Sequence, residues 1–222
     1  MQLPLGRSPM STLSVASRIY VINLPQRTRR RLGMEQLRLS LGLDFTYING
    51  TEAEGEAVYR IMRHILAFRA LASSQKTNRP PPPDFRWPQE VDALVESESP
   101  LGMEGSDLWP FDTVDFPDPY GHEPLTCAYD NSTFAPYSPQ TPPYRLLTRE
   151  RLACWHSHWR VIRLIADGQD DVSLVLEDDV DMELDIRQRL LGVWDYLPSP
   201  WDIVFLGTLS WMDARNASVT VM

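Results

Sequence analysis

Cysteine is scarce in this sequence, and so are long apolar runs. The two cysteines among 222 residues, Cys127 and Cys154, are too few for a disulfide framework or a zinc site of their own. No apolar run approaches the roughly 20 residues that cross a bilayer, and residues 1–17 lack the continuous apolar core of a secretory signal. We therefore expect a soluble chain without a transmembrane segment, and its compartment stays open.

Positive charge is also in the minority. The net charge of −9 argues against a nucleic-acid partner or an anionic membrane surface, because both require a basic surface. A local exception is the basic run that contains Arg27, Arg29, Arg30 and Arg31. The hydrophobic content of 43% and the length suffice for one domain with a real core.

The first third of the chain predicts a strand–helix–strand unit. Residues 18–24 form a continuous run of β-branched and aromatic residues, typical of a strand buried on both faces of a parallel sheet. Pro25 cannot donate to a strand ladder and ends that run. Apolar residues at helical spacing predict a helix over 29–41, and a second strand follows over 45–49. Another helix is predicted over 54–72.

Proline dominates the middle of the chain. Fourteen of the 19 prolines lie between Pro80 and Pro143, and regular periodicity is lost there, so we expect an irregular insertion over 75–144. Its many aromatic residues favour an excursion lying on the domain over a solvated linker. The predicted organisation is a disordered N-terminus (1–17), a single domain (18–207) that contains this insertion, and a divergent tail (208–222).

A helix is predicted over 148–166, with Thr148 as its N-cap. Apolar and aromatic residues at helical spacing form one stripe along it, which consists of Cys154, Trp155, His158, Val161, Ile162 and Ile165. We therefore expect His158 to face inward and His156 to lie away from the centre of that face.

The last elements complete an alternating pattern. A short apolar strand is predicted over 173–176, a helix over 183–196 and a final strand over 201–207. Strands that alternate with helices indicate an α/β fold with a mostly parallel sheet flanked by helices.

Four carboxylates follow the strand over 173–176, namely Glu177, Asp178, Asp179 and Asp181. In open α/β sheets, ligands bind beyond the carboxyl ends of the strands. Four acids within five residues repel one another, and Mg²⁺ or Mn²⁺ is a natural neutraliser for such an oxygen-rich cluster. A bound divalent ion could hold substrate phosphates and act as a Lewis acid on a leaving group.

Two simpler interpretations stay open. The acids could be the solvated start of the next helix, where the macrodipole favours negative charge. The arginines near Arg30 could form a solvated helix face, or a guanidinium there could hold a diphosphate, because the first turn of that helix points toward the same sheet edge as the acids.

Four ordered motifs resemble glycosyltransferase family 25, which includes bacterial lipopolysaccharide glycosyltransferases and collagen galactosyltransferases. The first is Ile19-Tyr20-Val21-Ile22-Asn23-Leu24 with Arg27 and Arg30. The second is Ala153-Cys154-Trp155-His156-Ser157-His158, with Ala153 where the family has glycine. The others are Leu174-Val175-Leu176-Glu177-Asp178-Asp179-Val180 and Trp201-Asp202-Ile203-Val204-Phe205-Leu206-Gly207.

The resemblance implies a GT-A-like fold and transfer of a hexose from a UDP-sugar to a glycan or protein acceptor, with Mn²⁺ or Mg²⁺. It implies metal ligands at Asp179 and Asp181, and donor-binding residues at Asn23, Leu24, Arg27, Arg30, Glu177 and Asp178. It assigns no general base. Family members often occupy the secretory pathway, and this chain looks like a fungal-type member that departs from the family pattern after Gly207, as if shortened at its C-terminus.

Two other functions remain possible on the sequence. Asp179-Val180-Asp181 has the Asp-x-Asp form of a haloacid-dehalogenase-like phosphatase, in which the first aspartate attacks phosphate. Glu183, however, stands where such enzymes usually carry threonine or valine. The chain could also be a non-catalytic remnant that binds a nucleotide-sugar or a partner through the same pocket.

Overall fold

The computed structural model describes residues 10–74, 121–127, 136–198, 201–206 and 220–221. Most of the predicted insertion and nearly all of the predicted C-terminal tail lie outside the described residues. Within the described part, the architecture is α/β, as the alternating pattern predicted.

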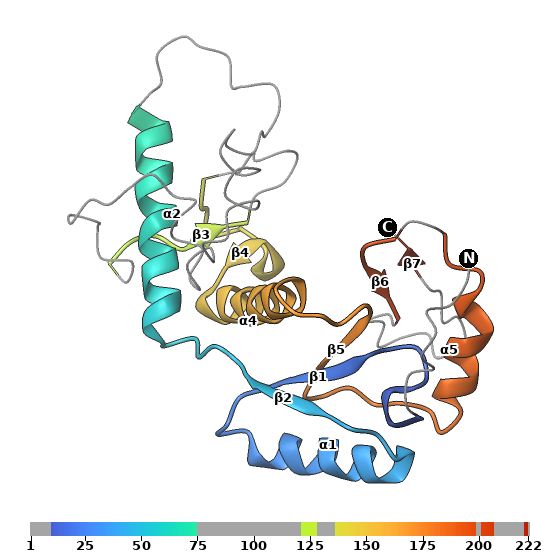
Figure 1. Ribbon diagram of the computed structural model, residues 1–222. Helices are drawn as coiled ribbons and strands as arrows, with labels where there is room; N and C mark the ends of the chain where they lie inside the picture. Colours follow the sequence, from blue (N-terminus) through green and yellow to red (C-terminus); the bar gives the residue numbers. More distant parts are fainter. Residues whose placement is uncertain (1–9, 75–120, 128–135, 199–200, 207–219, 222) are drawn as a thin grey trace. The chain divides into compact units, whose positions relative to one another are not determined.

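The central feature is a three-stranded, mostly parallel sheet in the order β2-β1-β5 (Figure 1). Its strands are β1 (Arg18–Asn23), β2 (Thr46–Asn49) and β5 (Ser173–Glu177). All of β1 except Arg18 is buried, and this middle strand has a neighbouring strand on each edge. The continuous apolar run had predicted this two-sided burial, and the prediction is confirmed.

Helix α1 (Thr28–Leu41) connects β1 to β2 and runs alongside the sheet (Figure 1). Its Met34 is 1% exposed, so the predicted apolar spacing does turn this residue into the core. The helix ends at Leu41, and the next residue, Gly42, has a φ of +63°, a left-handed conformation that glycine adopts without steric cost. The predicted strand–helix–strand unit is therefore present.

The described residues fall into two compact units. The first comprises residues up to Val21, Thr28–Thr46 and residues from Asp170 on; the second comprises Ile22–Arg27 and Tyr47–Gln169. The boundary passes through strands β1 and β2. The single domain predicted for 18–207 stays a prediction.

The first unit includes residues that had been assigned to a disordered start. Met10–Thr12 form a short 3₁₀ helix, and Leu13 and Ala16 are 1% and 0% exposed. Three hydrogen bonds tie this segment to the unit, from Ser17 N to Val172 O, from Asp44 N to Ser11 O, and from Arg187 Nη2 to Met10 O. The prediction of disorder is therefore corrected for residues 10–17. It failed because the two buried apolar side chains are isolated in the sequence and do not form a continuous apolar run.

Helix α5 (Ile186–Trp194) also belongs to the first unit. It begins three residues later than predicted, since 183–185 precede it as a loop and turn. The last predicted strand shrinks to β6 (Val204–Phe205), which pairs antiparallel with β7 (Thr220–Val221). β6 is therefore not part of the central sheet, and residues 220–221 of the predicted tail form a strand.

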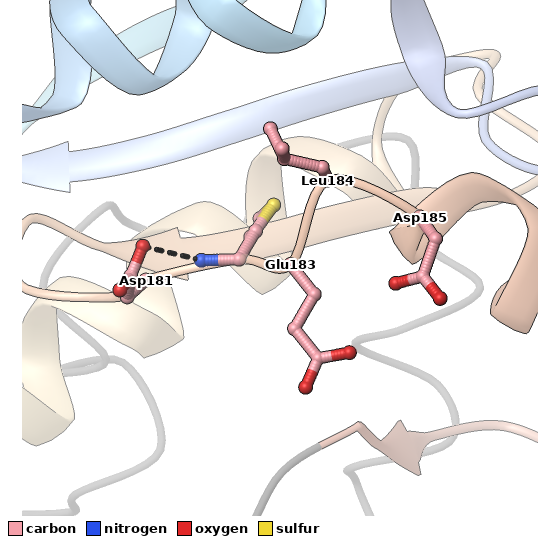
Figure 2. A pocket seen from close by; sticks show the side chains of 5 residues that line it. Asp181, Glu183, Leu184 and Asp185 are labelled. Atoms are coloured by element: carbon pink, nitrogen blue, oxygen red, sulfur yellow. Dashed lines mark hydrogen bonds between the residues drawn. The ribbon is translucent and has the colours of Figure 1, made fainter.

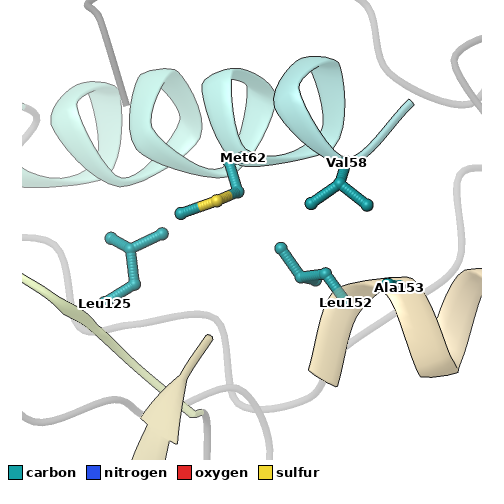
Figure 3. Close-up of a cluster of buried hydrophobic side chains, with 5 residues drawn as sticks. All are labelled: Val58, Met62, Leu125, Leu152 and Ala153. Carbon is teal, nitrogen blue, oxygen red and sulfur yellow. The ribbon is translucent and has the colours of Figure 1, made fainter. Parts of the chain in front are cut away.

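The second unit is built on two packed helices, α2 (Glu56–Ser74) and α4 (Arg149–Ala166). Two short strands join them, β3 (Leu125–Thr126) and β4 (Leu146–Leu147), which pair antiparallel. A 3₁₀ turn at Pro143–Arg145 leads into β4. Figure 3 shows the buried cluster between these elements, formed by Val58, Met62, Leu125, Leu152 and Ala153. The described parts of the predicted insertion thus include a strand, β3, which pairs with β4 just after the insertion's predicted end.

The buried face of α4 differs from the predicted stripe. The buried residues are Leu152, Ala153, His156, Ser157 and Val161, while Trp155 is 54% exposed and Ile162 is 50% exposed. His156 is 4% exposed and His158 is half-buried, the reverse of the expected order. The prediction followed the large apolar side chains, whereas the helix buries a face that contains small residues and a hydrogen-bonded histidine.

Candidate functional site

An ion-pair cluster lies at the carboxyl end of β5. Arg30 Nη1 is 2.9 Å from Asp178 Oδ1 and 2.9 Å from Asp179 Oδ2. The Asp178 side chain is 6% exposed, the Arg30 side chain 42% and the Asp179 side chain 50%. One guanidinium therefore bridges a buried acid and a solvent-facing acid.

The chain order of the first unit explains this meeting. Arg30 stands in the first turn of α1, directly after the loop that leaves β1, and the acids stand directly after β5, the neighbour of β1. The hydrogen bond to Asp178 raises the pKa of Arg30, and the negative charges of Asp179, Asp178 and Glu177 add to that effect. Arg30 thus stays charged and partly neutralises the cluster.

The arginine run does not behave as one solvated face. Arg29 is exposed, and Arg31 Nε lies 3.7 Å from Glu35 Oε1 on its own helix. Arg30, by contrast, forms ion pairs with two carboxylates outside its own helix. The solvated-face interpretation therefore fits Arg29 but not Arg30.

The helix-start interpretation of the acids also meets an obstacle. Helix α5 begins at Ile186 and has no acidic residue in its first turn. The favourable effect of a helix macrodipole falls off within the first turn. Glu177 to Asp181 lie at least five residues before that helix, so its dipole does not account for them.

An open pocket of about 510 Å³ follows the cluster along the chain, lined by Asp181, Met182, Glu183, Leu184 and Asp185 (Figure 2). Asp181 Oδ1 accepts a hydrogen bond from Met182 N at 2.8 Å (dashed in Figure 2). The other two acids are held by Arg189, with Nη2 2.6 Å from Glu183 Oε2 and Nε 2.9 Å from Asp185 Oδ1. Arg189 lowers the pKa of Asp185 mainly through this hydrogen bond.

The remaining predicted site residues belong to the second unit. Asn23 is 5% exposed, and its carbonyl oxygen accepts from Gly50 N at 2.9 Å. Leu24 is half-buried, and its carbonyl oxygen accepts from Arg27 N at 2.8 Å, which closes the turn after β1. Arg27 is exposed. The structure therefore brings together Arg30 and the acids, and separately Asn23 and Leu24 with Gly50.

A buried polar network in the second unit was missed by sequence reasoning. Thr51 N donates to Ser157 Oγ at 2.8 Å, and Thr51 Oγ1 lies 2.8 Å from His156 Nδ1. Ser157 Oγ donates in turn to Ala153 O at 2.7 Å. Ser157 and His156 lie inside the second family-like motif, and this was the sequence feature that could have identified them. Nothing in that motif indicated that Thr51 is their hydrogen-bond partner.

Comparison with known proteins finds partial relatives. Over 70 residues the chain is 36% identical to procollagen galactosyltransferase 1-B of Xenopus laevis, 31% to procollagen galactosyltransferase 2 of Homo sapiens, and 34% to procollagen galactosyltransferase 1 of Danio rerio. Part of this chain thus resembles procollagen galactosyltransferases. Each match covers 29% of this chain and only 12%, 11% and 12% of the respective relative.

The similarity to these galactosyltransferases agrees with the family resemblance of the motifs, while the fungal-type assignment and the shortened C-terminus stay predictions. No family model matches the chain, and no solved structure matches it. Among the described residues, no helix is both long enough and apolar enough to cross a membrane.

The acidic cluster offers the donors that a hard divalent cation prefers. Glu177, Asp179 and Asp181 are exposed, whereas Asp178 is buried against Arg30. Carboxylate oxygens suit Mg²⁺ and Mn²⁺. The chemistry of these donors therefore suits such an ion, although in the described part of the chain no three of the four carboxylates bring ligand oxygens within 4.8 Å of one another.

Proposed function

We propose that this chain carries the donor-binding part of a glycosyltransferase that transfers a hexose from a UDP-sugar to a hydroxyl of a glycan or protein. Three observations support the proposal. The fold is α/β, the acids stand at the carboxyl end of a sheet strand, and the partial relatives are galactosyltransferases. The single observation that carries it is the contact of Arg30 with Asp178 and Asp179.

That contact gives each acid a different role. Asp178 is buried and serves to anchor Arg30 at the edge of β5. Asp179 is half exposed, so its second oxygen can take a ligand from solvent. A buried charge must be paired, so the Arg30–Asp178 ion pair is expected to hold Arg30 in place. Arg30 in turn positions the carboxylate of Asp179.

In this proposal Asp179 and Asp181 are the metal ligands, with Glu177 beside them. A Mn²⁺ or Mg²⁺ ion held there would neutralise charge on the diphosphate leaving group. From the motif resemblance we count Asn23, Leu24 and Arg27 among the donor-binding residues, and the guanidinium of Arg30 offers hydrogen bonds to phosphate. We assign no general base among the described residues.

The proposal is tested by calorimetric titration of UDP with and without Mn²⁺. We expect binding that requires the ion, and Asp179→Asn should weaken it at least about tenfold, or 1.4 kcal/mol. Asp171→Asn is the matched control, because Asp171 is an exposed acid at the other end of β5. If the folded wild-type chain binds no UDP when Mn²⁺ is present, the proposal is wrong.

Turnover needs a separate measurement. Release of hexose from UDP-hexose in the presence of Mn²⁺ would support transfer chemistry. Tight UDP binding with no hydrolysis and no transfer would instead favour a binding protein without catalysis. Hydrolysis of a simple phosphate ester that is lost in Asp179→Asn would favour the phosphatase interpretation.

A further inference from the structure

The chain between β2 and α2 lies along helix α4. This stretch, residues 49–54, is called the β2–α2 connection below. Arg160 Nη1 donates to Asn49 O at 3.4 Å, Ser157 and His156 bond Thr51, and Arg149 forms an ion pair with Glu54. The contacts run in opposite order on the two segments, so the connection is antiparallel to the helix.

The connection is held at both ends and at its middle. Arg160 and Arg149 contact its two ends, and His156 and Ser157 contact Thr51 between them. Its last residues form a turn, in which Gly55 N donates to Glu52 O at 2.9 Å.

The contact at Thr51, in the middle of the connection, is made by buried side chains with several hydrogen bonds. Ser157 Oγ accepts from Thr51 N and donates to Ala153 O, so the orientation of its single proton is fixed. Ser157 and His156 are 5% and 4% exposed, and the His156 ring stacks on Trp159 with centroids 5.7 Å apart. Buried hydrogen bonds of this kind are costly to break, because water cannot replace the lost partner.

The other side of the connection contacts the end of β1. Gly50 N donates to Asn23 O at 2.9 Å. A Cβ atom added to Gly50 would lie 3.3 Å from Leu24 Cδ2 and 3.5 Å from Ile22 Cγ2, so the bare backbone sits directly against these side chains. The connection thus bonds α4 through Thr51 and contacts Leu24 through the neighbouring Gly50.

We propose that Thr51, His156 and Ser157 are positioning residues that fix Gly50 against Leu24. They thereby set the shape of the surface that the end of β1 presents to a nucleotide. This inference rests on the proposed function, because that proposal counts Leu24 among the donor-binding residues. The three residues act through the connection and do not themselves touch the donor.

The test uses two substitutions at Thr51. Thr51→Val keeps a branched side chain and the N–H bond to Ser157 but removes the hydroxyl that bonds His156; Thr51→Ser keeps that hydroxyl. We expect Thr51→Val to shift the ¹³C-methyl resonances of Leu24 and to weaken Mn²⁺-dependent UDP binding about three- to tenfold. In Thr51→Ser, the Leu24 methyl resonances and the affinity for UDP should both stay close to those of the wild type. UDP binding should still require Mn²⁺ in both variants.

A second pair of variants covers the case in which Thr51→Val does not fold. Gly50→Ala should displace Leu24, because the new methyl meets its Cδ2 at 3.3 Å. Gly33→Ala is the matched control, since a Cβ added at Gly33 meets nothing within 4 Å. Gly50→Ala should therefore weaken UDP binding and shift the Leu24 methyls, and Gly33→Ala should do neither.

The outcomes separate the two proposals. If the wild type binds UDP but Thr51→Val and Gly50→Ala bind it equally well, the positioning role is wrong and the proposed function stands. Unshifted Leu24 methyls in both variants would also overturn the positioning role. Absence of UDP binding by the folded wild type would instead reject the proposed function itself.

Discussion

Arg30 and Asp178 are 148 positions apart in the sequence, and their side chains meet at 2.9 Å. The pair connects the first turn of α1 to the turn after β5. It is asymmetric, because the carboxylate is buried and the guanidinium is 42% exposed. Removing the arginine would leave a buried negative charge, whereas removing the aspartate would leave a cation that water can solvate.

Arg30→Gln should therefore destabilise the fold more than a typical surface substitution. We expect a loss of about 1–2 kcal/mol in the free energy of unfolding, a moderate figure because solvent screens the exposed end of the pair. Arg29→Gln, on the same exposed helix turn, should change it by less than about 0.5 kcal/mol. Urea unfolding of the two variants measures the difference, and equal stabilities would show that Asp178 does not depend on Arg30.

Tyr20 should make the stability of the fold decrease at alkaline pH. Its hydroxyl donates to Asp170 Oδ2 at 2.8 Å, and burial, followed by that hydrogen bond, raises its pKa above the usual 10.0. A raised pKa in the folded state means that the stabilisation is complete below pH 10 and is lost as the pH rises through the higher folded value.

The measurement is chemical unfolding between pH 9 and pH 12 together with tyrosinate absorbance. Tyr20→Phe should flatten the alkaline loss of stability. Tyr196→Phe is the control, because Tyr196 is 86% exposed and should leave the profile unchanged. An alkaline profile of Tyr20→Phe that coincides with the wild type would contradict the assignment.

Helix α4 should depend on its N-cap. The Thr148 side chain accepts from Arg151 N at 3.4 Å, and a hydrogen bond with Thr148 lowers the pKa of Glu150. Thr148→Ala removes both and should cost about 1 kcal/mol, whereas Thr148→Ser should cost little. Thermal melts compare the three proteins, and an alanine variant as stable as the serine variant would mean that the cap contributes nothing.

Leu13 tests the ordered start of the chain. Because it is 1% exposed, Leu13→Ala should destabilise the protein by about 2–4 kcal/mol. Leu39→Ala is the matched control, since Leu39 is 69% exposed on α1. Equal melting temperatures for the two variants would indicate that residues 10–17 are disordered, as the sequence predicted.

The elements that the sequence predicted well are those with strong local signals. The run over 18–24, the proline after it and the helical spacing of Met34 identify β1, its end and α1 within one residue. The position of the acids after β5 follows from the same local pattern. Both are features that a few neighbouring residues determine.

The predictions that failed depend on contacts between distant residues. Burial of His156 and Ser157 requires Thr51, about 105 positions earlier, as their hydrogen-bond partner. An apolar stripe cannot indicate a polar residue that is buried because it is satisfied. Leu13 and Ala16 are likewise buried in a segment that hydrogen bonds tie to distant parts of the first unit, including the bond from Arg187 to Met10 O.

The Arg30 pairing has a consequence for the order in which ligands would arrive. One guanidinium serves two of the four carboxylates between Glu177 and Asp181, so negative charge still prevails at this edge. An anionic diphosphate would be repelled less strongly once a divalent cation had offset most of that negative charge. Binding should then be sequential, with the cation entering first and the nucleotide second, and the nucleotide leaving before the cation.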